Sequence, residues 1–223
     1  MKKILAIILA SMMLLTFVAC DNNNDNNNDN NNDSEESTSD IQASEEVMSA
    51  EDMLNATLDG FYSQIAPLFS SEDFAPSIDE IKAYYSGGYF SEEESTFCQG
   101  AAKELPLTDE FALGALISQT LISTENINKI DDAAIFFFSN ANSFTTFVYH
   151  VTDSADVQTL ANDFENAVSN NMWLCGFPEI YYAVQVGDFI FAGFGLADQI
   201  NAIRSSISDV YENATVLCEG VIR

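Results

Sequence analysis

This sequence has few positively charged residues and a single histidine. Seven lysines and arginines stand against 35 acidic residues, and the formal net charge of the 223-residue chain is −28. A surface this negative repels phosphate groups, so the composition excludes nucleic acid and anionic lipid headgroups as binding partners. The one histidine, His150, cannot complete a Cys₂His₂ zinc set, and there is no CxxC pair. We expect neither a metal nor a cofactor.

The motifs of common hydrolases are missing as well. No Gly-x-Ser-x-Gly sequence occurs, and a hydrolytic triad needs a nucleophile held against a histidine base. A reactive thiolate at Cys98 would need positive charge nearby, but only Lys103 is close and Glu92 to Glu94 oppose ionisation. We therefore expect no catalytic activity. The alternative is a surface hydrolase or thiol-dependent enzyme, which would require a pocket where Cys98 or His150 meets other polar groups.

The first twenty residues have the layout of a lipoprotein signal peptide. Lys2 and Lys3 precede an apolar stretch over residues 4–18, which is shorter than the ~20 residues that span a bilayer. The stretch ends in Phe17-Val18-Ala19-Cys20. This resembles the lipobox of bacterial lipoproteins, most of which have leucine in place of the phenylalanine. The resemblance implies that residues 1–19 are removed and that a lipid on Cys20 anchors an extracytoplasmic protein to the bacterial cell membrane.

Residues 20–47 are predicted to form the lipid anchor and a disordered tether. Asp21 to Asp33 is an Asp-Asn-Asn-Asn repeat without an apolar side chain, so nothing offsets the entropy of ordering it. A flexible chain of this length has a root-mean-square span of roughly 30 Å. A calcium-binding loop is the alternative, but the run lacks the central glycine and final glutamate of an EF-hand.

A change of composition at Met48 predicts a single globular domain over residues 48–223. Its first helix is expected to begin after Ser49 and to stop before Pro67, with apolar residues at helical spacing. A second short helix should carry Ile78, Ile81 and Tyr85. A third, from Phe111 to about Leu121, has no charge past its start and is expected to be buried on most sides.

The second half of the domain alternates two strands with one helix, twice. Strands are predicted at 133–138 and 144–151, and again at 180–186 and 189–194 around a Gly187-Asp188 hairpin. Helices should follow each pair, ending near Asn170 and Tyr211, before a last strand at 214–218. This ββα-ββα order predicts an α+β fold, in which N-terminal helices precede an antiparallel sheet with helices packed on one face.

Three segments carry a second resemblance. They are 132–136 (Asp-Ala-Ala-Ile-Phe), 153–157 (Asp-Ser-Ala-Asp-Val) and 186–191 (Val-Gly-Asp-Phe-Ile-Phe). They are similar to a family of short lipoproteins, mostly from anaerobic Gram-positive bacteria, known as domain of unknown function 4358. That family has a Gly-Asn-Tyr hairpin where this chain has Gly-Asp-Phe, and a glutamate in the first segment that this chain lacks. The resemblance covers about residues 77–213 and implies no catalytic residues.

The best candidate for a binding site is the apolar stretch from Met172 to Pro178, which lies in a predicted loop. It contains Trp173 and Phe177, large apolar residues of the kind that anchor protein interfaces. The stretch either forms an exposed patch for a partner or folds back over the helix–sheet layer.

The cysteines leave the disulfide pairing open, and the paired acids leave open a further type of site. Cys98, Cys175 and Cys218 are an odd number in an extracytoplasmic protein, which permits one disulfide and one free thiol or three buried thiols. Three acid pairs are candidates for a glycosidase-like or calcium site, but acids are also expected at helix starts and turns. These pairs are Glu72-Asp73, Asp109-Glu110 and Asp131-Asp132.

The sequence favours a non-enzymatic surface module that binds a protein, a peptide or a cell-wall polymer, and that reaches the membrane through its lipid. A small-ligand receptor of a transport system is another alternative. It is disfavoured because such receptors usually have two lobes, whereas this chain offers one ordinary domain.

Lipidation gives the first testable prediction. Replacing the acceptor, Cys20→Ala, should leave the precursor uncleaved at this position, because processing follows modification of the cysteine sulfur. Mass spectrometry of the membrane fraction measures the mature N-terminus directly. Recovery of a freely soluble mature form that begins at another residue would contradict the prediction.

Overall fold

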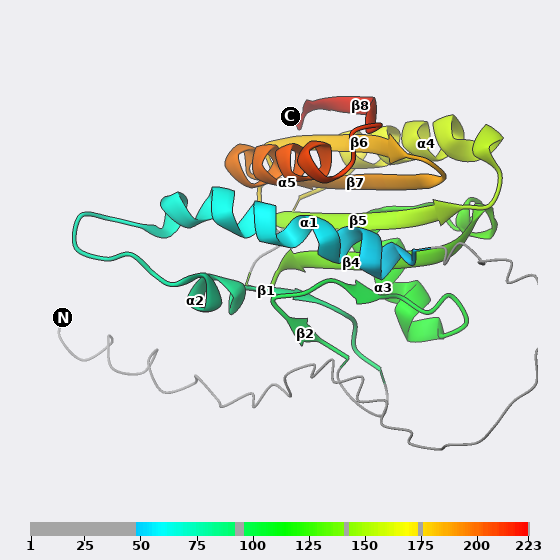
Figure 1. Ribbon diagram of the computed structural model, residues 1–223. Helices are drawn as coiled ribbons and strands as arrows, with labels where there is room; N and C mark the ends of the chain where they lie inside the picture. The colour runs from blue at the N-terminus through cyan, green and yellow to red at the C-terminus, as the bar shows by residue number, and fades with distance from the viewer. Residues whose placement is uncertain (1–47, 92–95, 141–142, 174–175, 223) are drawn as a thin grey trace, which may run out of the picture.

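The computed structural model describes residues 48–91, 96–140, 143–173 and 176–222 (Figure 1). The predicted signal peptide, Cys20 and the tether therefore lie outside the described residues. Within the described ranges, no helix combines the length and the apolar character needed to cross a bilayer.

The centre of the protein is one antiparallel sheet of eight strands, with the order β2-β1-β4-β5-β7-β6-β8 and β3 paired with β4. The α+β class and both predicted hairpins are confirmed. Gly187 occupies the β6–β7 turn with a φ of 58°, a conformation that glycine adopts without steric cost. The strands are β1 (Tyr85–Gly87), β2 (Cys98–Gln99), β3 (Lys103–Glu104), β4 (Ile130–Phe138), β5 (Phe144–Val151), β6 (Ile180–Val186), β7 (Phe189–Gly195) and β8 (Thr215–Val221).

The first and third helices begin at the predicted caps. Ser49 and Asp52 form a capping box at the start of the first helix, and Asp109 accepts hydrogen bonds from two backbone amides of the third. Tyr85 belongs to β1 and not to the second helix, which ends earlier than its apolar pattern suggested. The helices are α1 (Ala50–Ile65), α2 (Ile78–Lys82), α3 (Glu110–Thr120), α4 (Val157–Asn170) and α5 (Ala197–Val210), with 3₁₀ turns η1 (Ala66–Phe69), η2 (Ile127–Lys129) and η3 (Ser154–Asp156).

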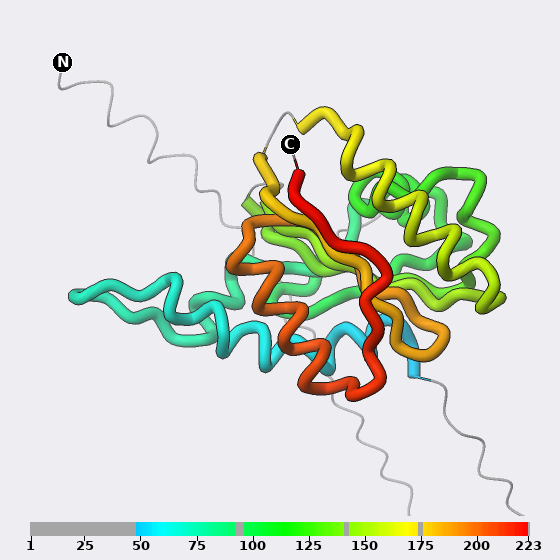
Figure 2. Tube along the Cα trace, turned by 90° about the horizontal axis from the view of Figure 1, so that it is seen from above, coloured from blue at the N-terminus to red at the C-terminus, as the bar shows by residue number. Residues whose placement is uncertain are grey.

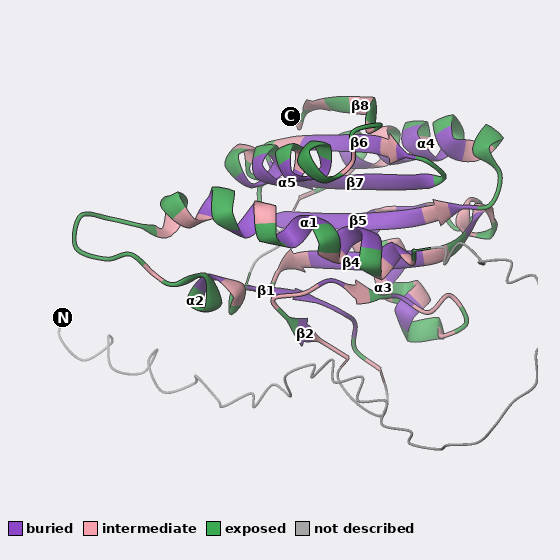
Figure 3. Ribbon diagram, in the orientation of Figure 1, coloured by how far each residue is buried: buried purple, intermediate pink, exposed green. Residues whose placement is uncertain are grey.

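Helices cover both faces of the sheet, so the prediction of helices on one face is wrong. One hydrophobic core lies between the sheet and helices α1 and α5, and the other between the sheet and α3 and α4. Figures 1 and 2 show α5 and α4 on opposite sides of β6 and β7. The central strands are consequently buried along their length (Figure 3).

The two-sided arrangement follows from the hand of the chain connections. Helix α4 joins the parallel strands β5 and β6 across β7, and α5 joins the parallel strands β7 and β8 across β6. Both connections move in the same direction across the sheet, towards β8. They start from β5 and β7, which are antiparallel to each other. Crossovers between parallel strands are almost always right-handed, and two such connections must then lie on opposite faces. The repeated ββα order in the sequence suggested that both units are equivalent. It therefore did not predict that α4 and α5 lie on opposite faces of the sheet.

Close packing of α1 on α5 and on an aromatic cluster fixes the first core. A Cβ atom on Gly60 would lie 2.3 Å from Ser206 Oγ, and the Ser206 hydroxyl donates to the Thr57 carbonyl. Phe61 stacks on Phe144 at 5.2 Å between ring centroids and meets the edge of Phe136 at 5.8 Å. Helix α1 is thereby held rigidly over β4 and β5.

The exposure of α3 differs from the prediction. Only Ala112, Leu116 and Thr120 of this helix are buried, whereas Phe111 is 38% exposed. The helix packs with one face against the sheet, over β5, and among the described elements nothing covers the opposite face. An absence of charged residues therefore did not indicate burial on most sides.

Phe164 on α4 tests the second core. Its side chain is buried and meets the edge of the Phe147 ring at 5.4 Å. Phe164→Ala should lower the free energy of unfolding by about 3–5 kcal/mol, as measured by urea denaturation. The matched control, Phe177→Ala, removes a ring that is 77% exposed and should change stability by no more than about 0.5 kcal/mol. A loss below about 1 kcal/mol at Phe164 would contradict this core.

Candidate functional site

The structure separates the two residues of the predicted binding stretch. Trp173 is half-buried in the second core, with its ring centroid 4.8 Å from that of Phe194. Its Nε1 is buried and has no hydrogen-bond partner among the described residues. Phe177 and Met172 are 77% and 78% exposed. Trp173 thus packs against the sheet, while its apolar neighbours face solvent, and residues 174–175 between them lie outside the described ranges.

The His150 imidazole is hydrogen-bonded to an acid and not to a nucleophile. Its Nδ1 lies 2.5 Å from Asp131 Oδ1, and its ring packs 4.8 Å from that of Phe189. Within the part of the chain that the structure describes, no serine, threonine or cysteine is hydrogen-bonded to this imidazole. The pair has the base and the orienting acid of a triad without the group that would attack a substrate.

The cysteines lie apart in the sheet. Cys98 is buried on β2, near one edge, and Cys218 is a free thiol on β8, at the other. Burial raises the pKa of Cys218 to about 11, and Glu165 and Glu219 add to the effect. A thiol with a raised pKa is a poor nucleophile at neutral pH. Any pairing that involves Cys175 lies outside the described residues.

Three of the six paired acids, Asp109, Asp131 and Asp132, have structural partners. Asp109 caps α3, and Asp132 Oδ2 accepts a hydrogen bond of 2.6 Å from the Ala50 amide at the start of α1. Asp131 is engaged with His150. The residues described by the structure contain no cluster of three or more metal-binding side chains. At Asp109 and Asp132, helix capping explains the acids without a metal or a glycosidase site.

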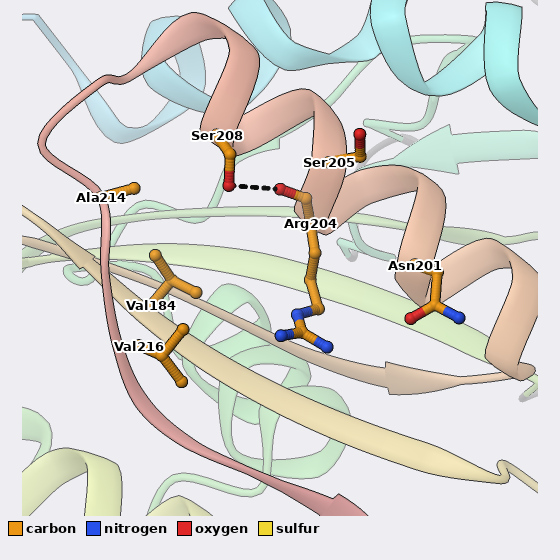
Figure 4. Close-up of a pocket in the computed structure, with 7 residues that line it drawn as sticks. All are labelled: Val184, Asn201, Arg204, Ser205, Ser208, Ala214 and Val216. Carbon is orange, nitrogen blue, oxygen red and sulfur yellow. Dashed lines mark hydrogen bonds between the residues drawn. The ribbon is translucent and has the colours of Figure 1, made fainter.

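A groove of about 250 Å³ lies between α5 and the strands β6 and β8. Figure 4 shows Arg204 reaching from α5 towards the strands, where Val184 and Val216 line the groove. The guanidinium forms an ion pair with Glu219 on β8. Because its charge is already neutralised, Arg204 joins α5 to the edge strand and leaves no cationic site for an anionic ligand.

The most conspicuous surface feature is a projection formed by residues 66–80, which we call the arm. It extends beyond the end of the sheet in both views (Figures 1 and 2). At its tip Ser71 and Phe74 exchange backbone hydrogen bonds, with N···O distances of 2.7 and 3.4 Å. At its base the Tyr84 ring stacks between those of Phe69 and Phe138, at centroid distances of 5.8 and 6.2 Å. These contacts give the arm a defined shape.

The arm combines exposed apolar side chains with acids. Leu68, Phe74 and Ile78 are 52%, 60% and 36% exposed. Glu72 and Asp73 occupy the tip, Asp79 and Glu80 follow, and residues 66–80 contain no basic residue. Hydrogen bonds from the Ser77 amide and hydroxyl lower the pKa of Glu80, so this carboxylate is charged at neutral pH. An apolar surface rimmed by charge is typical of a protein interaction site.

Sequence reasoning missed the arm. The signal was present, because Pro67 and Pro76 bracket a short segment with Leu68 and Phe74 but no regular spacing. Such a segment predicts only a loop, and the exposure of its apolar residues depends on how far α1 extends past the sheet.

Comparison with known proteins gives no match: no family model fits this sequence, and no curated protein or solved structure is significantly similar to it. The resemblances to bacterial lipoproteins and to domain of unknown function 4358 therefore stay predictions.

Substitution of Trp173 distinguishes a core role from a binding role. Because its ring packs on Phe194, Trp173→Ala should lower the free energy of unfolding by about 2 kcal/mol or more. Met172→Ala, at a side chain that is 78% exposed, is the matched control and should have little effect. Urea denaturation followed by circular dichroism measures both. Unchanged stability of Trp173→Ala would contradict the packing role and restore this residue as a binding candidate.

Proposed function

We propose that this chain is a lipid-anchored extracytoplasmic binding module without catalytic activity, which docks onto a protein partner through its arm. The observation that carries the proposal is the arm itself, a shaped projection that exposes Phe74 and Leu68 among acids. Burying such apolar side chains in a partner would provide the favourable free energy of association. The lipobox resemblance supports the location at the membrane.

The charge of the arm defines the chemistry of the partner. Glu72, Asp73 and Asp79 are exposed around the apolar side chains. The first base after them, Lys82, lies over the ring of Tyr62 at 5.4 Å from the centroid. A complementary surface is therefore an apolar recess surrounded by lysine or arginine side chains. The repeat-rich acidic segment before the domain would add long-range attraction for the same basic partner.

Photo-crosslinking on intact cells tests the proposal. A photoreactive phenylalanine analogue in place of Phe74 should yield one defined protein adduct, and the yield should fall as salt is added, because screening weakens exposed charge pairs. The same analogue in place of Phe177, a ring on another part of the domain that is even more exposed, is the matched control and should not give this adduct. No adduct from position 74, or the same adduct from both positions, would contradict docking through the arm.

A second variant distinguishes specific binding by the arm from nonspecific hydrophobic association. With the analogue placed at Leu68, Phe74→Ala should lower the adduct yield, because truncating an aromatic anchor costs about 2 kcal/mol or more of binding free energy. Phe177→Ala in the same background should leave the yield unchanged. Equal losses from both substitutions would show that the contact is not specific to the arm.

A further inference from the structure

A second cavity, at the far end of the sheet from His150, has a different chemistry from the arm. It is a depression open to solvent, of about 300 Å³, between the C-terminal half of α3, the end of β4 and the start of β5. This volume is at the lower end of the range for small-ligand sites. Its lining includes Ser118 and Gln119 of α3, Phe137 of β4, Asn140 of the turn and Thr145 of β5. We call it the α3–β4 pocket.

The lining of the α3–β4 pocket carries no charged side chain. Along β4 the nearest acid is Asp132, five residues from Phe137, which at the rise of a strand is roughly 16 Å away. Helix α3 has no charge between Phe111 and Thr120. The pocket therefore offers a neutral environment on an otherwise acidic protein.

Hydrogen-bonding groups in the pocket remain available. Neither the Gln119 nor the Asn140 amide forms a hydrogen bond with another described residue, and the same is true of the Thr145 hydroxyl. Ser118 donates to the Ala115 carbonyl and keeps its lone pairs as acceptors. Amides and hydroxyls both donate and accept, so this set suits a ligand that presents hydroxyl groups in several directions.

Aromatic rings continue from the pocket onto the surface. Phe137 is half-buried and lies 6.0 Å from Phe97 between ring centroids, and Phe97 lies 4.6 Å from Phe90. Phe90 is 75% exposed. Both pairs meet edge to face, at interplanar angles of 80° and 81°. The row therefore gives a continuous apolar surface of alternating ring faces and edges, against which a chain-like ligand could pack.

We propose that the α3–β4 pocket and the row Phe137, Phe97 and Phe90 bind a neutral oligosaccharide. A sugar ring has an apolar C–H face that packs on a phenyl ring, and hydroxyls that bond to Gln119, Asn140 and Thr145. The absence of charge in the lining favours a neutral sugar over a phosphorylated or uronic one. No residue of the arm lines this site, although Phe138 of its lining packs on Tyr84 at the base of the arm. The tests below use neither Phe74 nor Phe138, so their outcome does not depend on docking through the arm.

Calorimetric titration of the full chain in detergent tests the proposal, with cellohexaose and chitohexaose as neutral probes and hexagalacturonate as the anionic comparator. At least one neutral hexasaccharide should bind with a dissociation constant below about 1 mM, and hexagalacturonate should bind more weakly. Failure of both neutral probes to bind the folded protein would overturn the proposal, and so would equal binding of the anionic comparator.

Variants assign the binding to this pocket. Gln119→Ala should weaken the affinity about tenfold, the effect of losing one well-placed hydrogen bond. Phe90→Ala should weaken a hexasaccharide more than the corresponding disaccharide, because Phe90 lies at the outer end of the row. Both side chains are at least partly exposed, so neither substitution should disturb the hydrophobic core or the fold. Gln158→Ala, an exposed amide on α4, is the matched control. Unchanged binding in both Gln119→Ala and Phe90→Ala would overturn the assignment.

Discussion

Burial of both faces of the sheet is the constraint on which the rest of this structure depends. Every residue of β7 is buried, so helices must cover the sheet on each side, and the right-handed connections β5–α4–β6 and β7–α5–β8 place them there. These two connections leave part of the first face of the sheet uncovered. The N-terminal region of the domain covers that part. Helix α1 completes the first face over β4 and β5, and the arm is the part of that N-terminal region that has passed beyond the sheet.

The distribution of charge separates the surface into regions with different possible partners. Lys103, Lys129 and Arg204 are each paired with an acid, so little positive charge is left to attract an anion. The arm exposes acids around apolar side chains, which selects a basic protein surface. The α3–β4 pocket is lined by neutral groups, which selects a neutral ligand. His150 and Cys218 have the environments of structural groups, since one is paired with Asp131 and the other has a raised pKa.

Local patterns in the sequence predicted local structure well. The capping box at Ser49, the Gly187-Asp188 hairpin and the helical spacing of Val157, Leu160 and Phe164 all correspond to observed elements. What failed were properties set by the path of the whole chain. Whether α5 lies on the same face as α4 depends on strand order, and the exposure of α3 and of Phe74 depends on which elements happen to cover them. Trp173 and Phe177 look alike in sequence, yet only the position of Phe194 makes one of them a core residue.

Hydrogen exchange in the cell envelope tests the central claim, that the arm is the docking surface, most directly. Exchange of peptides that cover residues 66–80 would be measured in isolated envelopes and in the purified chain in detergent, with the β6–β7 hairpin at Gly187 as an internal reference. Docking predicts that the arm amides exchange at least about tenfold more slowly in envelopes, because a bound partner excludes solvent, while the reference hairpin is unchanged. Equal exchange of the arm in both preparations would contradict the account.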